Sequence, residues 1–400
     1  MRRVLLVNKF YYPRGGDCIV VLNTEALLRE NGVEADVLAM EYSQNLITRY
    51  SRLFPGEVTF GGSVGNRLRA MRRTLGMGDV RTQTEAVLDE FKPDVVHLHN
   101  IHSYLSPVVG ELAHKRGIRV VWTLHDYKLL CPRYDCLLDG RPCEHCFKGA
   151  KLGVLTHRCM KGSLPASVVA WIEAMKWNRK ALESFTDVFV CPSEFMADKM
   201  KAGGFDPARI QVLNNFLDPV KYKLYQELAN SLPREDYYCY VGRLSQEKGV
   251  ADLLDVASRL PYRLKVAGSG PLADELKKKY GQCSNIEFMG MLDAQGVARL
   301  LVGSRLSVVP SQWYENNPLS VVESLCAGTP VAGSQIGGIP ELIGKESGIT
   351  FQPFDNETLT TAITMAMARQ WDHDTIAHQA RERFGPKAQF EVLMKKIYGL

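Results

Sequence analysis

The feature that most constrains the fold is an alternation of short apolar segments with amphipathic helical segments. Near the N-terminus the apolar segment "RVLLVN" (3–8) precedes a glycine-containing loop, "YYPRGGD" (11–17), and a helical pattern over 18–32. The helical pattern ends on Gly32, which suits the left-handed residue that follows many helices. A second apolar segment, "EADVLAM" (34–40), comes next. This order predicts a βαβ unit of a parallel sheet, in which ligands bind at the carboxyl ends of the strands.

The alternation forms two series, which predicts two domains. The first series continues through "RVVWTLHD" (119–126), and the second starts near residue 236 with "DYYCYVGRL". Between them, at "VLNNFLDP" (212–219), the pattern breaks into Asn, Asp and Pro. A chain of 400 residues is also too long for one ordinary core. We therefore predict two Rossmann-like α/β domains, over residues 1–216 and 217–383, with the ligand site in the cleft between them.

Composition and charge exclude several classes of protein. The net charge of +5 is small for this length, and no segment concentrates Lys and Arg among aromatic residues, which argues against a nucleic-acid partner. No apolar run approaches the ~20 residues of a membrane span, and the N-terminus lacks a signal-peptide pattern, so a cytoplasmic location is expected. One basic patch, "RLRAMRR" (67–73), is either a solvated helix face or a contact with an anionic membrane surface.

Two glutamates flank an unusual segment within residues 311–343. Pro318 suits the first turn of a helix, with Asn317 as its N-cap. The free N–H groups at that helix start predict an anion site. A phosphate there would place Glu323 near a ribose diol and Glu315 near the group that the phosphate carries. The alternative is two unrelated surface glutamates.

A second segment also predicts a site for a phosphorylated ligand. The loop "VGRLSQEKG" (241–249) places Arg243 and Lys248 after the first strand of the second series. Two cations in one loop suit the binding of a diphosphate. The alternative is an ordinary solvent-exposed loop. The glycine-rich turns "VAGSGPL" (266–272) and "PRGGD" (13–17) permit close approach of the backbone to a ligand.

Together these segments resemble the family 4 retaining glycosyltransferases. The resemblance rests on the Glu315–Glu323 segment, on "VGRLSQEKG", on "VAGSGPL" and on "FMGML" (288–292). In the first half it rests on the Gly15-Gly16 loop and on "WTLHD" (122–126). It extends over essentially the whole chain, and the second half carries most of its specificity. It implies the GT-B fold, with two facing Rossmann-like domains.

The resemblance also implies roles for individual residues. Arg243 and Lys248 are expected to bind the donor diphosphate, Glu323 the ribose and Glu315 the transferred sugar. With His125, which is expected near the reacting centre, Glu315, Arg243 and Lys248 form the predicted catalytic set; the alternative for His125 is a structural histidine. The remaining predicted donor-binding positions are Gly15, Gly16, Gly268, Met289, Met291, Asn316, Asn317, Pro318 and Leu319.

The implied reaction is transfer of a sugar from a UDP- or GDP-sugar to a glycan, lipid-linked or small-molecule acceptor. The acceptor attacks from the side of the leaving group, and the cations and the helix start stabilise the departing charge. No cofactor is required in the family. Surface polysaccharide or lipopolysaccharide assembly is the expected pathway, with peripheral contact at the inner face of the membrane. The C-terminal segment 384–400 is expected to be a helix that crosses back to the first domain.

Five of the ten cysteines fall within residues 131–159, a segment predicted to be an insertion in the first domain. They include a Cys-x2-Cys pair, whose spacing suits tetrahedral zinc. We predict a structural zinc site formed by four of these five residues; an iron–sulfur cluster, free thiols and redox-sensitive disulfides are the alternatives. The candidate ligands are Cys131, Cys136, Cys143, Cys146 and Cys159.

Two other functions fit parts of the pattern. A nucleotide-sugar epimerase or hydrolase with the GT-B fold would share the nucleotide-binding half, but it needs a closed pocket without an acceptor. A non-catalytic carbohydrate-binding relic of the fold would not require the set of Arg243, Lys248, Glu315 and Glu323. The presence of that set favours an enzyme.

Overall fold

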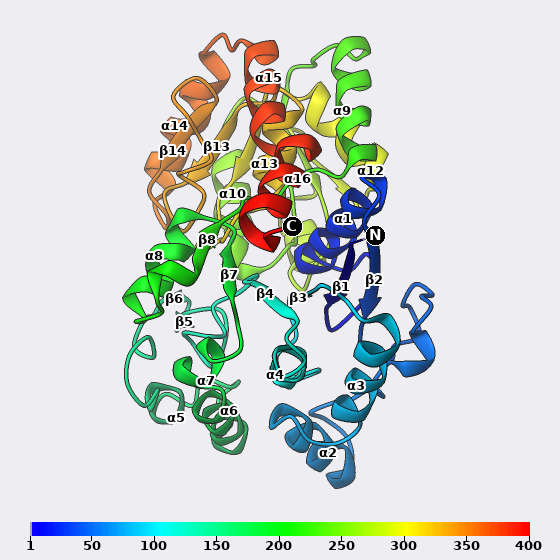
Figure 1. Cartoon of the computed structure of the whole chain (residues 1–400). Helices are drawn as coiled ribbons and strands as arrows, with labels where there is room; N and C mark the ends of the chain where they lie inside the picture. The colour runs from blue at the N-terminus through cyan, green and yellow to red at the C-terminus, as the bar shows by residue number, and fades with distance from the viewer. Residues whose placement is uncertain (1) are drawn as a thin grey trace. The chain divides into compact units, whose positions relative to one another are not determined.

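A computed structural model describes residues 2–400 and divides the chain into two units. Each unit contains one six-stranded parallel sheet with helices around it (Figure 1). The predicted α/β class with two parallel-sheet domains is therefore confirmed. The first unit comprises residues up to Leu138, Cys143–Leu213 and Phe390–Leu400, and the second comprises Asp139–Pro142 and Asn214–Gln389.

The sheet of the first unit has the strand order β2-β1-β3-β4-β7-β8. Every neighbouring pair is parallel, and the strands are almost entirely buried, as expected for a parallel sheet covered on both faces. In chain order the strands are β1 (Arg3–Val7), β2 (Glu34–Leu38), β3 (Val95–Leu98), β4 (Arg119–Thr123), β7 (Val188–Cys191) and β8 (Ile210–Val212).

Within residues 2–213, the first unit contains eight α-helices. They are α1 (Gly16–Glu30), α2 (Val64–Thr74), α3 (Asp79–Phe91), α4 (Val108–His114), α5 (Gly153–Thr156), α6 (Leu164–Lys176), α7 (Arg179–Glu183) and α8 (Glu194–Ala202). Two short strands, β5 (Leu137–Leu138) and β6 (Arg141–Pro142), lie in the cysteine-rich segment.

The C-terminal segment returns to the first unit. It leaves helix α16 (Pro386–Val392) and continues as a π-helix over Leu393–Tyr398. The Tyr398 hydroxyl lies 2.7 Å from Nδ1 of His97 on β3, and Nε of Arg119 on β4 donates to the Ile397 carbonyl at 3.1 Å. Both contacts are made by strands in the middle of the sheet, so the C-terminal segment is part of the packed core of this unit.

The second unit repeats the architecture with a different strand order, β11-β10-β9-β12-β13-β14. Its strands are β9 (Tyr237–Val241), β10 (Arg263–Ala267), β11 (Ile286–Gly290), β12 (Leu306–Val309), β13 (Val331–Ser334) and β14 (Gly348–Phe351). Its helices are α9 (Pro219–Ser231), α10 (Val250–Ala257), α11 (Ala273–Tyr280), α12 (Ala294–Gly303), α13 (Leu319–Cys326), α14 (Asn356–Ala368) and α15 (His373–Phe384). Two buried apolar clusters, one with Val322 of α13 and one with Leu253 of α10, form its core.

Strand order determines where each sheet can bind a ligand. In the first sheet, β2 lies on one side of β1 and β3 lies on the other, so the order of the strands reverses at β1. In the second unit the same reversal lies between β9 and β12. At such a switch point the loops after two adjacent strands diverge and leave a crevice at their carboxyl ends. The loops after β1 and β3, and the loops after β9 and β12, therefore border the two crevices.

Candidate functional site

The switch point of the second unit brings Lys248 and Glu315 together. Lys248 ends a short 3-10 turn after β9, and Glu315 lies in the loop after β12. Lys248 Nζ lies 2.5 Å from Glu315 Oε1, and Ser311 Oγ donates to the same oxygen at 2.7 Å. Burial raises the pKa of Glu315, but the Lys248 charge and these hydrogen bonds outweigh burial and lower it overall. Glu315 is therefore an ionised carboxylate at neutral pH.

The backbone holds these two loops at close range. The Gln312 N–H donates to the Glu247 carbonyl at 2.8 Å. Gly249 has φ +64°, and a Cβ there would lie 1.9 Å from the Pro310 carbonyl oxygen. Only glycine fits this position, because a side chain would collide with rigid backbone. The glycine that ends "VGRLSQEKG" thus sets the distance across which Lys248 reaches Glu315.

A second close contact between glycines lies at the carboxyl ends of β10 and β11. The Gly268 N–H donates to the Gly290 carbonyl at 2.8 Å, and a Cβ on Gly268 would lie 1.9 Å from the Gly242 carbonyl oxygen. The predicted residues Arg243 and Met291 flank these glycines and are exposed, and Met291 has 72% of its surface accessible. Polar backbone and exposed side chains therefore share the carboxyl edge of β9, β10 and β11.

The segment before α13 corrects one prediction. The N-cap residue of α13 is Pro318, and Asn317 does not cap the helix as predicted. Asn317 Oδ1 instead accepts from the Asn215 N–H at 3.0 Å, and the Asn317 carbonyl accepts from Asn215 Nδ2 at 2.7 Å. Asn317 is buried, and its Nδ2 has no hydrogen-bond partner within residues 2–400. Because most buried polar groups are paired, this amide nitrogen has a hydrogen-bond donor left for a further partner.

Glu323, on α13, is paired with a residue that the sequence did not predict. Lys221 Nζ, from the first turn of α9, lies 3.0 Å from Glu323 Oε1. No motif marks Lys221 in the sequence, because its position depends on the packing of α9 against the rest of the second unit. A carboxylate with one bound ammonium group keeps further lone pairs that accept from hydroxyl groups.

The switch point of the first unit gathers a second polar group. Gly15 is the N-cap residue of α1, and Gly16 begins the helix with open space where a Cβ would be. Asp17 follows in the first turn, accepts from Asn100 Nδ2 at 3.0 Å and lies 3.8 Å from Lys9 Nζ. The Lys9 N–H donates to the Asn100 carbonyl at 3.1 Å, which joins the loops after β1 and β3.

His125 completes this group and is held by another histidine. His125 Nε2 lies 2.9 Å from His99 Nδ1. Burial lowers the pKa of His125 to about 4 and that of His99 well below its usual range, so both rings are neutral at pH 7. His99 Nε2 has no partner within residues 2–400. A proton there would be an orphaned buried donor, so we assign it to His99 Nδ1, which donates to His125 Nε2. His125 then carries its own proton on Nδ1 and is a neutral hydrogen-bond donor.

The predicted site residues divide between the two units. The first unit contains Gly15, Gly16 and His125; the second contains Arg243, Lys248, Gly268, Met289, Met291, Glu315, Asn316, Asn317, Pro318, Leu319 and Glu323. Sequence reasoning missed Lys9, Asp17, His99, Asn100 and Lys221. The alternating "HLHN" at the end of β3 was the available signal for two of these five.

The cysteine-rich segment lies in the first unit, apart from Asp139–Pro142. All ten cysteines of the chain are free thiols. A hydrogen bond from the Cys136 thiol is the largest cause that lowers the pKa of Cys131, to about 6, and burial raises the pKa of Cys146 to about 11. Across residues 2–400, no three His, Cys, Asp or Glu side chains are grouped closely enough to hold a metal ion. The zinc site therefore stays a prediction.

Metal analysis tests this prediction directly. Protein purified without chelator is expected to contain about one zinc per chain by plasma mass spectrometry, because four thiolates bind zinc tightly. Replacing Cys143 and Cys146 with serine should abolish the zinc, whereas Cys283→Ser, outside the cluster, should retain it. Metal-free wild-type protein would contradict the zinc site and leave a cluster of free thiols.

Comparison with known proteins covers both units. The family described as "Glycosyltransferase Family 4" matches residues 15–221, and "Glycosyl transferases group 1" matches residues 227–389. The glycogen synthase of Mycobacterium tuberculosis is 26% identical over 338 residues, which are 82% of this chain and 73% of that protein. The putative teichuronic acid biosynthesis glycosyltransferase TuaC of Bacillus subtilis is 27% identical over 209 residues, 51% of each chain. The structure of Anabaena HepE in complex with UDP is similar over the full length of both chains, with a TM-score of 0.63 and 16% identity.

Proposed function

This chain belongs to glycosyltransferase family 4, and from that premise we propose that it transfers a sugar from a nucleotide-sugar donor to a glycan or lipid-linked acceptor, with retention at the anomeric carbon. The observation that carries the proposal is the contact of Lys248 with Glu315 at the switch point of the second sheet. A buried carboxylate that holds a lysine at the carboxyl ends of parallel strands is an arrangement suited to a phosphorylated ligand.

The second unit offers a partner for each part of a nucleotide sugar. Lys248 and Arg243 supply positive charge for the diphosphate. The unpartnered Asn317 Nδ2 is a further donor at the start of α13, and Glu323 supplies acceptors for the ribose hydroxyls. We favour a UDP- or GDP-sugar; the UDP complex of HepE supports the first of these.

The charges suggest how the residues assist transfer. As the bond between the anomeric carbon and the diphosphate breaks, negative charge grows on the leaving oxygen. Lys248, which Glu315 holds in place, stabilises this charge with little reorganisation, and the exposed Arg243 adds a second positive charge. His125 is neutral at pH 7 and carries its proton on Nδ1, so it orients a sugar hydroxyl as a donor and does not act as the base. The departing phosphate then takes the proton of the attacking hydroxyl.

A thermal-shift screen tests the donor site. UDP, GDP, ADP and CMP, alone and as sugar conjugates, are added to the whole chain. A nucleotide present at a hundred times its Kd stabilises the native state by about 2.7 kcal/mol, which is a shift of a few degrees. We expect one base to give this shift in the wild-type protein and Lys248→Ala to lose it. No shift with any nucleotide would contradict the proposed function.

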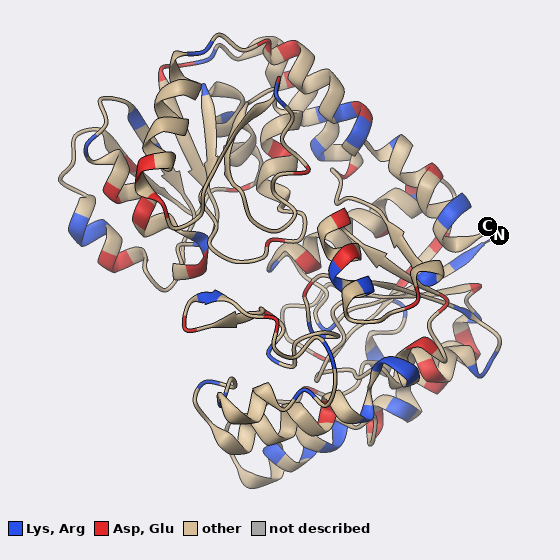
Figure 2. Cartoon of the chain, turned by 90° about the vertical axis from the view of Figure 1, so that its left-hand side faces the viewer, with Lys and Arg blue, Asp and Glu red and all other residues tan. Residues whose placement is uncertain are grey.

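We also propose that helix α2 contacts an anionic membrane surface, where lipid-linked acceptors reside. Residues 61–69 are exposed without interruption, and Val64 and Leu68 are one turn apart, with 81% and 50% of their surfaces accessible. Arg67, Arg69 and Arg72 are also exposed. Figure 2 shows Lys and Arg on the helices at the lower end of the first unit, where Figure 1 places α2 and α6. None of the helices in residues 2–400 has the length and apolar character needed to cross a membrane.

Arg73 is not part of this surface. It has 1% of its surface exposed, and its guanidinium donates to the Tyr104 and Gly56 carbonyls and to Asp79. The sequence pattern places Arg73 with the other arginines of the patch, but its side chain points into the unit and anchors the C-terminal end of α2. A test of membrane binding must therefore leave Arg73 intact, because its loss would disturb the fold.

Neutralising the three exposed arginines is expected to weaken vesicle binding. Each basic residue near an anionic surface contributes about 1 kcal/mol, so Arg67→Gln, Arg69→Gln and Arg72→Gln together should weaken binding roughly a hundredfold. The measurement is co-sedimentation with vesicles that contain phosphatidylglycerol. Exchanging Lys277, Lys278 and Lys279 of α11 for glutamine removes the same charge elsewhere and should have little effect. Equal binding by both triple variants would contradict the role of α2.

A further inference from the structure

Four aromatic residues form a cluster at the carboxyl ends of β1, β2 and β3. We call it the aromatic platform: Phe10, Tyr12, Tyr42 and Tyr104. The Tyr12 and Tyr42 rings are stacked, with centroids 5.5 Å apart and planes at 13°, and Phe10 lies edge-on, 5.1 Å from Tyr42. Phe10 is buried, whereas the three tyrosines are partly accessible. The tyrosine rings of the platform are therefore partly exposed to solvent and pack against the buried ring of Phe10.

Hydrogen bonds hold the loops that carry the platform. The Met40 N–H donates to the Lys9 carbonyl at 3.2 Å, and the Leu46 N–H donates to the Tyr11 carbonyl at 2.8 Å. The Tyr11 N–H in turn donates to Asn45 Oδ1 at 2.9 Å. The loop after β1 and the loop after β2 are therefore joined on both sides of Tyr42. Rings that are ordered before a ligand arrives lose little conformational entropy when it binds.

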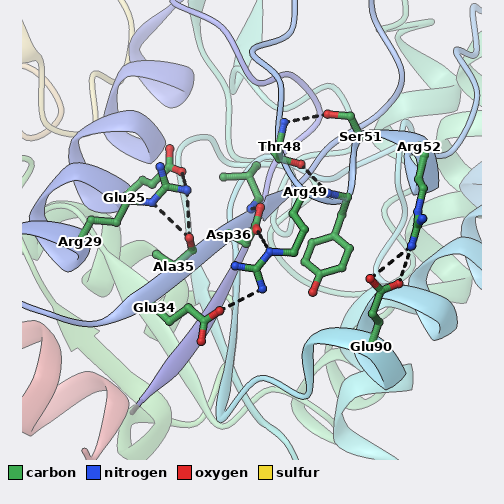
Figure 3. A network of polar contacts seen from close by, with 12 residues as sticks. Glu25, Arg29, Glu34, Ala35, Asp36, Thr48, Arg49, Ser51, Arg52 and Glu90 are labelled. Carbon is green, nitrogen blue, oxygen red and sulfur yellow. Dashed lines mark hydrogen bonds and ion pairs between the residues drawn. The ribbon is translucent and has the colours of Figure 1, made fainter.

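A network of ion pairs anchors the far end of the second loop (Figure 3). Arg49 lies between Glu34 and Asp36 of β2, 3.0 Å and 3.8 Å from their carboxylates. The Thr48 N–H donates to Ser51 Oγ at 2.8 Å. The loop that carries Tyr42 is thus fixed to its own strand as well as to the loop after β1.

Two cations border the platform. The Arg14 guanidinium lies 4.4 Å from the Phe10 ring centroid, and Lys9 Nζ lies 5.8 Å from the Tyr104 centroid. Arg14 is exposed and makes no ion pair within residues 2–400, so its N–H groups are available. A planar guanidinium stacked on an aromatic ring suits bidentate contact with a carboxylate or a phosphate.

The platform is continuous with the candidate site of the first unit. Lys9 contacts both, since its Nζ lies 3.8 Å from Asp17 Oδ2 and its N–H donates to the Asn100 carbonyl. Burial is the main cause of the lowered pKa of His125; the Asp17 charge opposes it, and the positive charge of Lys9 adds to it. Lys9 therefore lies between the tyrosines and the group that contains His125. A ligand bound on the tyrosines would extend past Lys9 toward His125.

From this geometry we propose that the aromatic platform is an acceptor subsite for a sugar ring that carries an adjacent carboxylate or phosphate. The inference rests on the proposed transfer reaction and names the class of its acceptor. The C–H face of a sugar ring packs against the negative face of a tyrosine ring, and Arg14 and Lys9 bind the anion. A uronic acid in a polysaccharide and the phosphate of a lipid-linked sugar both supply this chemistry.

The test is saturation-transfer difference NMR on the whole chain with three soluble probes. Methyl glucuronide represents the uronic acid, glucose 1-phosphate represents the sugar phosphate, and methyl glucoside is the neutral reference. We expect at least one anionic probe to bind more tightly than the glucoside. Tyr12→Ala and Tyr42→Ala should weaken that binding roughly tenfold, whereas Tyr12→Phe, which keeps the ring, should retain it. Arg14→Gln should reduce the preference for the anionic probe over the glucoside, and Lys9 should account for the preference that is left.

Each outcome decides between alternatives. Preference for methyl glucuronide supports the platform and identifies a uronic acid, and preference for glucose 1-phosphate supports it and identifies a sugar phosphate. Binding that is the same in wild type, Tyr12→Ala and Tyr42→Ala overturns the platform, as does equal affinity for all three probes. Nucleotide thermal shifts on the same variants separate this result from the proposed function, because the donor site lies in the second unit and should respond normally when only the platform fails.

Discussion

Lys248→Ala is expected to lower kcat by about a thousandfold, the largest single effect predicted for this protein, because it removes a fixed cation from the charge that develops on the leaving diphosphate. Glu315→Gln keeps the size of the side chain but removes the carboxylate that holds Lys248 Nζ at 2.5 Å. It should therefore also reduce kcat strongly. The measurement is steady-state turnover with the nucleotide sugar identified by thermal shift.

A matched pair elsewhere in the second unit controls for general electrostatic effects. Arg263 and Glu287 form an exposed ion pair at 2.6 Å between β10 and β11. Exposed pairs contribute about 0–1 kcal/mol, so Glu287→Gln should leave kcat and stability nearly unchanged. Near-normal turnover by Lys248→Ala or by Glu315→Gln would refute the assigned site, provided that the variant is folded.

Thermal melts at two pH values show whether the Lys248 variant has the expected charge state. In the wild type, the folded-state pKa of Glu315 lies below its ordinary value, so Glu315 contributes stability above that value and loses it as pH falls. In Lys248→Ala, burial of Glu315 is no longer opposed by a cation, and the folded-state pKa should rise. The variant should therefore be destabilised most at neutral pH and recover part of the loss in mild acid.

Deletion of residues 390–400 is expected to unfold the first unit. The segment buries Leu393, Met394, Ile397 and Tyr398, each with 5% or less of its surface exposed. At about 1.5–3 kcal/mol for each buried apolar side chain, their loss removes roughly 6–12 kcal/mol. That is comparable with the ~5–15 kcal/mol stability of a whole domain. Hydrogen exchange should show loss of protection in β3 and β4.

Two milder variants make the deletion interpretable. Tyr398→Phe removes only the hydroxyl that lies 2.7 Å from His97 Nδ1 and should cost about 1 kcal/mol. Lys395→Gln and Lys396→Gln alter exposed positions of the same segment and should have almost no effect. Full protection of β3 and β4 after the deletion would show that the segment is not part of the core.

Local pattern was enough to predict the two sheets and, at the switch point of the second sheet, the residues Lys248 and Glu315. Lys248 and Glu315 are close because each follows a strand of apolar residues, and the two strands are neighbours in the sheet. Contacts of this kind can be predicted once the strands have been identified in the sequence. His125 was also predicted, but its partner His99 was not, since that contact depends on the pairing of β3 with β4.

Other features depended on packing that no local pattern encodes. Lys221 and Glu323 are 102 positions apart and meet because α9 and α13 lie in the same unit. Arg73 was grouped with a surface patch, but the carbonyls of Gly56 and Tyr104 bind its guanidinium inside the unit. The N-cap role predicted for Asn317 failed for the same reason, because Asn215 takes the amide oxygen.

The route of the chain also has a consequence for biosynthesis. The six strands of the first sheet leave the ribosome before residue 214, but the segment Phe390–Leu400 that completes their core follows only after the entire second unit. Domains normally fold as they emerge, from the N-terminus onward. Here the apolar surface of the first unit stays uncovered until translation has passed the second unit, so we expect the nascent chain to depend on chaperones. A fragment that stops at residue 213 would remain in that state, and linking residues 390–400 to it should restore folding.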